Sequence, residues 1–219
     1  MNKFINSLLL FIFFPTMALT IFVGYDMPVE FLKTSGSQIP YRFEIFLVLG
    51  LIILIINVRR SIRRWMGMRL VNKIDKFKWN QPMTQERKKR VQVYNLLEAF
   101  VLLFVGLTLY YVSNEAWLPA IAFCFTSVDN IIFTLIGSTK NRFRAGITSK
   151  AVIIADRDVS LVYFSGLRKV TIHQDSIYFD YIKGLQLSFP VDCIAEKDQF
   201  FKVLEEQLDR DRVFITKER

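Results

Sequence analysis

The chain contains four long, predominantly apolar stretches, at positions 4–23, 43–57, 91–112 and 116–136. A helix needs about 20 such residues to cross the hydrocarbon layer of a membrane. The second stretch is shorter, but Val58 and Ile62 extend it while the neighbouring arginines reach toward the headgroups. The pattern therefore predicts four transmembrane helices.

Beyond residue 150, apolar residues alternate with polar ones, which is typical of strands with one buried face. This alternation predicts five short strands, at 151–155, 159–164, 168–173, 176–182 and 184–189. From residue 196 the spacing becomes helical, with Phe200, Phe201, Leu204 and Leu208 on one stripe. We expect a small antiparallel sheet closed by one C-terminal helix.

Together these patterns predict an α-helical membrane protein with a small α+β domain at its C-terminus. The helical domain would comprise residues 1–145 and the α+β domain residues 146–219. The composition agrees, because 52% hydrophobic residues and 21 Phe among 219 residues exceed the needs of an ordinary soluble core.

The net charge of +9 comes from one segment of the chain. Residues 58–92 contain twelve basic and two acidic residues, a net charge of +10, whereas residues 146–219 contain eleven basic and twelve acidic residues. This distribution argues against a nucleic-acid partner, because no basic surface extends over the soluble part. The positive-inside rule places the 58–92 loop and both termini in the cytoplasm.

Apolar residues recur at roughly helical intervals within this basic loop, from Val58 through Ile62 and Trp65 to Phe77. One interpretation is an amphipathic helix that lies on an anionic membrane surface. The alternative is a loop whose charge only fixes the topology. The candidate lipid-contacting residues are Arg59, Arg60, Arg63, Arg64, Trp65, Arg69, Arg87, Lys88, Lys89 and Arg90.

The last 75 or so residues resemble the bacterial pleckstrin-homology-like (PH-like) domains of the YcxB-like and YdbS-like membrane proteins. The resemblance lies in a strand entering after GIT at 146–148, a turn at Asp175 and Ser176, the segment LSFPVDCI at 187–194, and a closing helix with the FF..L...L spacing. It implies a bacterial inner-membrane protein with a cytoplasmic binding or assembly module. It implies no catalytic residues.

Two acidic residues interrupt the apolar stretches. The third and fourth predicted helices form a hairpin centred near Ser113 and Asn114, so Glu98 and Asp129 are expected at one depth, roughly 10 Å from the cytoplasmic end. Asn95 and Asn130 lie at neighbouring levels. Two ionised carboxylates at one depth in a low-dielectric layer would repel each other, so at least one needs a proton, a cation or a basic partner.

These four polar residues have two interpretations. One is a proton or cation site. The other is a packing role, in which they hydrogen-bond across helices or pair with an arginine of the basic loop or of a partner subunit. Four helices without a broken-helix repeat favour the second interpretation.

The sequence shows no catalytic, cofactor-binding or metal-binding pattern. It has one histidine, His173, and two cysteines, Cys124 and Cys193, without metal-ligand spacing. The favoured function is a non-enzymatic membrane protein that presents its PH-like domain to a protein or lipid partner, or to another copy of itself. The alternative is a subunit of a proton- or cation-translocating complex that uses Glu98 and Asp129. A membrane enzyme is the third hypothesis.

Overall fold

A computed structural model describes residues 2–29, 34–173, 175–182, 184–208 and 213–217, with the side chains of α1 from Phe11 on. The chain divides into two units. The helical unit contains the described residues up to Ile62 together with Asn95–Ile132. The sheet unit contains Arg63–Tyr94 and the described residues from Phe133 on. The division predicted between residues 145 and 146 falls inside a strand, β4 (Arg144–Ile147).

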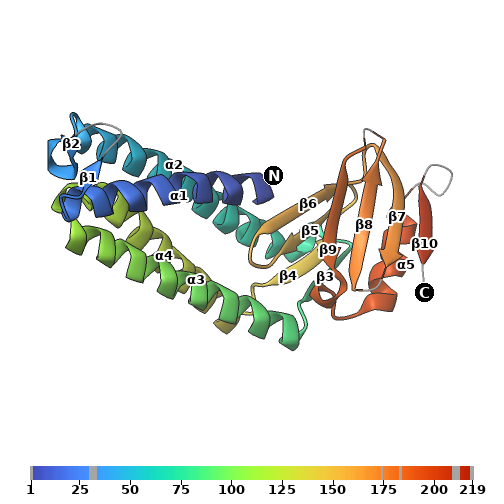
Figure 1. The fold of residues 1–219 in the computed structure, drawn as a ribbon. Coiled ribbons are helices and arrows are strands. Elements are labelled where there is room, and N and C mark those ends of the chain that lie inside the picture. Colours follow the sequence, from blue (N-terminus) through green and yellow to red (C-terminus); the bar gives the residue numbers. More distant parts are fainter. Residues whose placement is uncertain (1, 30–33, 174, 183, 209–212, 218–219) are drawn as a thin grey trace. The chain divides into compact units, whose positions relative to one another are not determined.

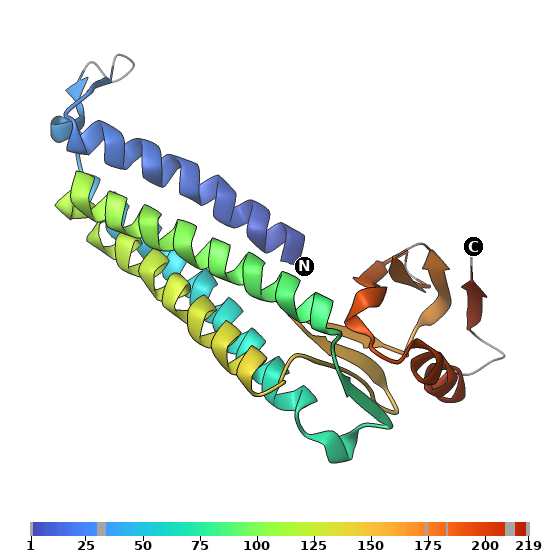
Figure 2. The same ribbon diagram turned by 90° about the horizontal axis from the view of Figure 1, so that it is seen from below.

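Four helices make up most of the helical unit: α1 (Asn2–Gly24), α2 (Arg42–Val71), α3 (Gln85–Val112) and α4 (Trp117–Thr139). Figures 1 and 2 show them lying side by side. The short strands β1 (Pro28–Val29) and β2 (Thr34–Ser35) and the 3-10 turn η2 (Gly36–Gln38) connect α1 to α2. The core of the unit contains Phe46, Ile53, Leu109 and Phe123.

Among the described residues, three helical segments are long and apolar enough to cross a membrane: Arg42–Val71, Gln85–Val112 and Asn114–Thr139. The last two form the predicted antiparallel hairpin, joined by the 3-10 turn η4 (Asn114–Ala116). The first predicted span, 4–23, lies in α1, where Phe11–Gly24 is a shorter apolar helix. Three of the four predicted spans are therefore found.

The sheet unit contains two four-stranded sheets (Figure 1). The first has the order β3-β4-β5-β6 and is entirely antiparallel. Its strands are β3 (Trp79–Pro82), β4, β5 (Ala151–Ala155) and β6 (Val159–Tyr163). The 3-10 turn η3 (Ile74–Lys76) precedes β3.

The second sheet has the order β10-β7-β8-β9. It contains β7 (Leu167–His173), β8 (Ser176–Tyr181), β9 (Gln186–Pro190) and β10 (Phe214–Lys217). Strand β10 runs parallel to β7, and the other pairs are antiparallel. The 3-10 turn η5 (Val191–Cys193) and the helix α5 (Lys197–Gln207) follow β9.

The predicted strands between residues 151 and 189 and the closing helix are confirmed, with ends that shift by one or two residues. The predicted small domain of mostly antiparallel strands is found. Its described strands form two sheets where one was expected, and β3, β4 and β10 were missed. Their short sequences, such as WNQP and FITK, lack a recognisable alternation. Strand β3 forms by pairing with β4, and β10 by pairing with β7, and both partners are distant in the sequence.

One continuous core joins both sheets, α5 and the helix ends of the sheet unit. It includes Met68, Phe133, Ile154, Phe179 and Phe200. Strand β5 is buried on both faces, because Val152 and Ile154 enter this core while Ile153 and Ala155 pack with Val71 of α2 in a second, smaller cluster. Both sheets therefore share their core with the ends of α2, α3 and α4 that belong to this unit.

Gly67 of α2 shows how closely helix and sheet approach within this unit. A Cβ atom at this position would lie 1.9 Å from Cγ2 of Val159 in β6. Only glycine permits this contact, because any side chain would push the helix away from the strand.

Candidate functional site

Glu98 is paired with an arginine inside the helical unit. Arg60 Nη1 donates to Glu98 Oε1 over 2.7 Å, and Nη2 lies 3.4 Å from Oε2. The two side chains are only 11% and 19% exposed. Arg60 comes from α2 and Glu98 from α3, so this two-pronged ion pair joins two helices and compensates the charge of the acid.

Asp129 of α4 has a different neighbour on α2. The hydroxyl of Ser61 donates to Asp129 Oδ1 over 2.8 Å. Ser127 Oγ donates to the carbonyl of Ala99 on α3 over 2.7 Å, which places the two acids at one level of the hairpin, as predicted. Glu98 and Asp129 thus contact two consecutive residues of α2, Arg60 and Ser61. Asn57, also on α2, donates a longer hydrogen bond of 3.4 Å to the Ala122 carbonyl.

We call this group of side chains the polar cluster: Asn57, Arg60, Ser61, Asn95, Glu98, Ser127, Asp129 and Asn130. It connects α2, α3 and α4 in an otherwise apolar unit. Hydrogen bonds and an ion pair of this kind hold helices together where lipid offers no alternative partner. The sequence predicted the four polar residues of α3 and α4, but it missed Asn57, Ser61 and Ser127.

Two of the three asparagines of the polar cluster, Asn95 and Asn130, are fully buried. Neither polar side-chain atom of Asn95 hydrogen-bonds to any residue that the structure describes. A buried amide in this state lowers stability, because it loses its hydrogen bonds to water on burial.

We expect Asn95→Leu to stabilise the helical unit by about 1 kcal/mol, since leucine has the same branched side-chain shape and no polar atoms to desolvate. The thermal unfolding midpoint in detergent measures the effect. Asn57→Leu is the matched control, because it removes a hydrogen bond that exists and is expected to lower the midpoint. A lower midpoint for Asn95→Leu would show that Asn95 binds a polar group.

Six of the ten residues predicted to contact lipid make contacts within the chain and are not exposed. Arg64 is 1% exposed and lies 4.0 Å from the centre of the Phe133 ring, and Trp65 packs edge-on against the same ring. Lys88 Nζ donates to Asn141 Oδ1 over 2.8 Å, and Arg63 donates to the Val159 carbonyl over 3.3 Å. The residues left exposed are Arg59, Arg69, Lys89 and Arg90.

Arg87, at the start of α3, is the centre of a network in the sheet unit that sequence reasoning missed. Arg87 Nη2 lies 2.7 Å from Asp156 Oδ2, and Nη1 lies 3.5 Å from Asp192 Oδ1. Arg90 reaches the other oxygen of Asp192 over 3.2 Å. Asp156 follows β5 and Asp192 lies in η5, so α3 is tied to both sheets.

Thr84 completes this Arg87 network. Its Oγ1 accepts a hydrogen bond from the Arg87 amide over 3.2 Å, as a helix N-cap does, and donates to the Asp192 carbonyl over 2.7 Å. Nothing in the sequence distinguishes these residues from an ordinary charged surface, because the acids are far from Arg87 along the chain.

Cys193 borders the same network but does not have the environment of a nucleophile. Burial raises the pKa of its thiol, and the nearby Asp156 carboxylate raises it further. The thiolate, which is the reactive form, is therefore disfavoured. Among the residues that the structure describes, no group of three His, Cys, Asp or Glu side chains is placed to hold a metal ion.

Comparisons with protein-family models, with curated protein sequences and with solved structures find no match to this chain.

Proposed function

We propose that this chain is a multi-pass membrane protein without enzymatic activity, whose sheet unit is a cytoplasmic binding or assembly module for a protein or lipid partner. The observation that carries the proposal is the construction of the sheet unit. Strand β3 lies between α2 and α3 in the chain and pairs with β4, which follows α4. The sheet unit is therefore formed by the segment that connects α2 to α3 together with the segment that follows α4.

The membrane arrangement is part of this proposal. We propose a bacterial inner membrane, with α1 as a fourth span and both termini in the cytoplasm, because the basic segment 58–92 covers the end of α2, the connection and the start of α3. The meander of β7, β8 and β9 followed by α5 supports the PH-like interpretation. The exposed Arg59, Arg69, Lys89 and Arg90 support contact with anionic lipid of the inner leaflet.

Proton or cation translocation by the polar cluster is the second candidate function. The burial of Asn95 without a described partner favours it, because such a residue can bind water or an ion. The Arg60–Glu98 ion pair favours the structural role, because it compensates one of the two acids inside the helical unit.

Proton flux and partner binding distinguish the two functions. We expect liposomes that contain the full chain to remain tight to protons from about pH 5 to about pH 8, and a partner or a second copy to co-purify in mild detergent. Asp129→Asn is expected to fold, because its amide oxygen still accepts the Ser61 hydrogen bond, but to assemble less well. Glu98→Gln tests the other acid.

Two outcomes would change these assignments. A pH-dependent proton flux that Asp129→Asn abolishes would overturn the proposal in favour of translocation. Unchanged assembly in both variants would leave the acids with a role in packing alone.

A further inference from the structure

The C-terminal strand β10 occupies the edge of the second sheet in an unusual way. It pairs in parallel with β7, with Phe214 opposite Lys169 and Ile215 opposite Val170. Val213 is buried and Ile215 is partly buried, whereas Phe214 is 68% exposed. Four residues with one exposed large aromatic side chain are a weak cover for a sheet edge, because parallel pairs are slightly less stable per residue than antiparallel ones.

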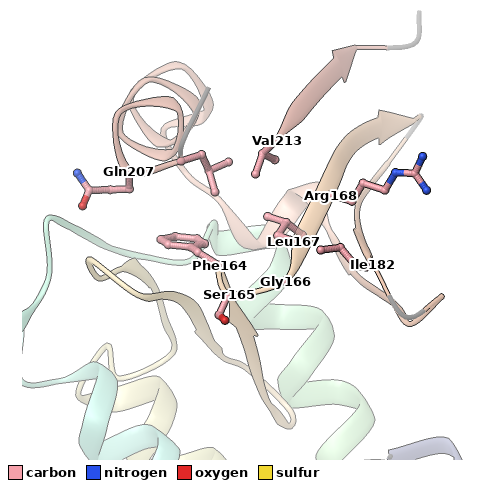
Figure 3. Close-up of a pocket in the computed structure, with 9 residues that line it drawn as sticks. Phe164, Ser165, Gly166, Leu167, Arg168, Ile182, Gln207 and Val213 are labelled. Carbon is pink, nitrogen blue, oxygen red and sulfur yellow. The ribbon is translucent and has the colours of Figure 1, made fainter. Parts of the chain in front are cut away.

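A cavity of about 630 Å³ lies at the beginning of this strand. Figure 3 shows it between the end of α5, the start of β7 and Val213, with Arg168 and Gln207 extending to opposite sides. Its apolar lining includes Phe164, Leu167, Ile182, Leu208 and Val213. Strand β10 therefore leaves apolar surface unfilled next to the edge that it covers.

The described charged side chains of β7 are basic. Strand β7 contributes Arg168 and Lys169, and Lys169 is the register partner of Asp180 on the inner strand β8. Among the described residues, neither Arg168 nor Lys169 forms an ion pair. A strand with acidic residues would complement this edge better than β10 does.

We propose that the β7 edge is the docking site for an extended acidic segment of a protein partner, and that β10 occupies this site in the free chain. The partner strand would displace β10, take over its main-chain hydrogen bonds to β7, place an apolar side chain in the cavity and bring its acids to Arg168 and Lys169. The β10 segment of a second copy fits this site less well, because its sequence FITK is basic, as are Arg168 and Lys169 of β7. This inference rests on the proposed binding function.

Two synthetic peptides test the site by fluorescence anisotropy on a chain truncated before Val213. One has the sequence of residues 213–219, and the other carries Lys217→Glu and Arg219→Glu. We expect the acidic peptide to bind about tenfold more tightly than the natural one, as about two surface ion pairs provide. Added salt is expected to reduce the difference. Arg168→Glu with Lys169→Glu is expected to reverse it.

A reversible cross-link keeps the test decisive if truncation disturbs folding. Thr171 and Thr216 are paired in register, so Thr171→Cys with Thr216→Cys should retain β10 under oxidation. Neither peptide is then expected to bind, and reduction should restore binding. The single-cysteine variants are the controls, and the native Cys193 is buried.

The results separate the docking site from the proposed function. The docking site is wrong if a peptide binds to the oxidised cross-linked chain. It is also wrong if neither peptide binds to the truncated chain and neither binds to the reduced double-cysteine variant. Tighter binding of the natural peptide overturns the acidic partner in favour of a second copy. If a native partner still co-purifies with the oxidised chain, the docking site is wrong while the proposed binding function stands.

Discussion

Replacing Arg87 with alanine is expected to lower the free energy of unfolding of the sheet unit by about 3 kcal/mol. Arg87 holds Asp156 and Asp192, which are only 13% and 25% exposed, and it connects α3 to both sheets. Without the guanidinium, Asp156 keeps its charge in a largely desolvated position with no cation in reach among the described ion pairs. The loss should appear as a lower unfolding midpoint.

Trp79 fluorescence reports this unfolding, because the indole is buried in the core of the sheet unit and packs against Phe200. Trp65 and Trp117 are replaced by phenylalanine in both the reference chain and the variants. The matched control is Arg90→Ala. Arg90 belongs to the same network but is 54% exposed, so its removal should change stability by less than about 1 kcal/mol.

A double variant distinguishes an unpaired charge from lost packing. Arg87→Met with Asp156→Asn removes both charges, while the asparagine preserves the turn in which Asp156 Oδ1 accepts the Asp158 amide hydrogen bond. Asp192 retains Arg90 in this variant. We expect most of the lost stability to return. Equal midpoints for Arg87→Ala and Arg90→Ala would contradict the role that we assign to Arg87.

The second large effect is expected for Arg60→Ala, which should destabilise the helical unit by about 3 kcal/mol. The variant leaves Glu98, 19% exposed in a helix long and apolar enough to cross a membrane, without its guanidinium partner. Glu98→Gln should have a smaller effect, because Gln still accepts a hydrogen bond from Arg60 and the long arginine side chain can extend toward the headgroups. The order of the two midpoints tests this asymmetry.

Arg59→Ala is the control for this experiment, because Arg59 is the exposed neighbour of Arg60 on α2. Thermal unfolding in detergent, followed by size-exclusion chromatography, measures all variants. Arg60→Met with Glu98→Leu should recover stability, since it replaces the ion pair with apolar side chains of similar size. If Arg60→Ala unfolded at the same temperature as Arg59→Ala, the ion pair would not be what holds α2 to α3.

The polar cluster shows how far sequence reasoning reached at the candidate site. The hairpin arithmetic placed Glu98 and Asp129 at one level, and the Ser127 hydrogen bond to Ala99 confirms that level. An arginine of the basic segment as a partner was among the interpretations, and Arg60 fills that role for Glu98. The contact between Ser61 and Asp129 was not predicted, because the sequence does not show which neighbouring helix a serine side chain faces.

The sequence by itself determined the features that depend on neighbouring residues. Apolar length located three helices that are long and apolar enough to cross a membrane, and the change to a period of two located the strands between residues 151 and 189. Such patterns are local, because each element buries one face of its own segment.

Tertiary structure decided which distant segments meet. Strands β3 and β10 exist because β4 and β7 pair with them, and Arg87 becomes the centre of a network because Asp156 and Asp192 are brought to the start of α3. Rotation of α2 about its own axis directs Arg60 to Glu98 and buries Arg64 over Phe133. Strand pairing and helix rotation are set by packing across the whole unit. Hydrophobic periodicity along one segment therefore cannot predict them.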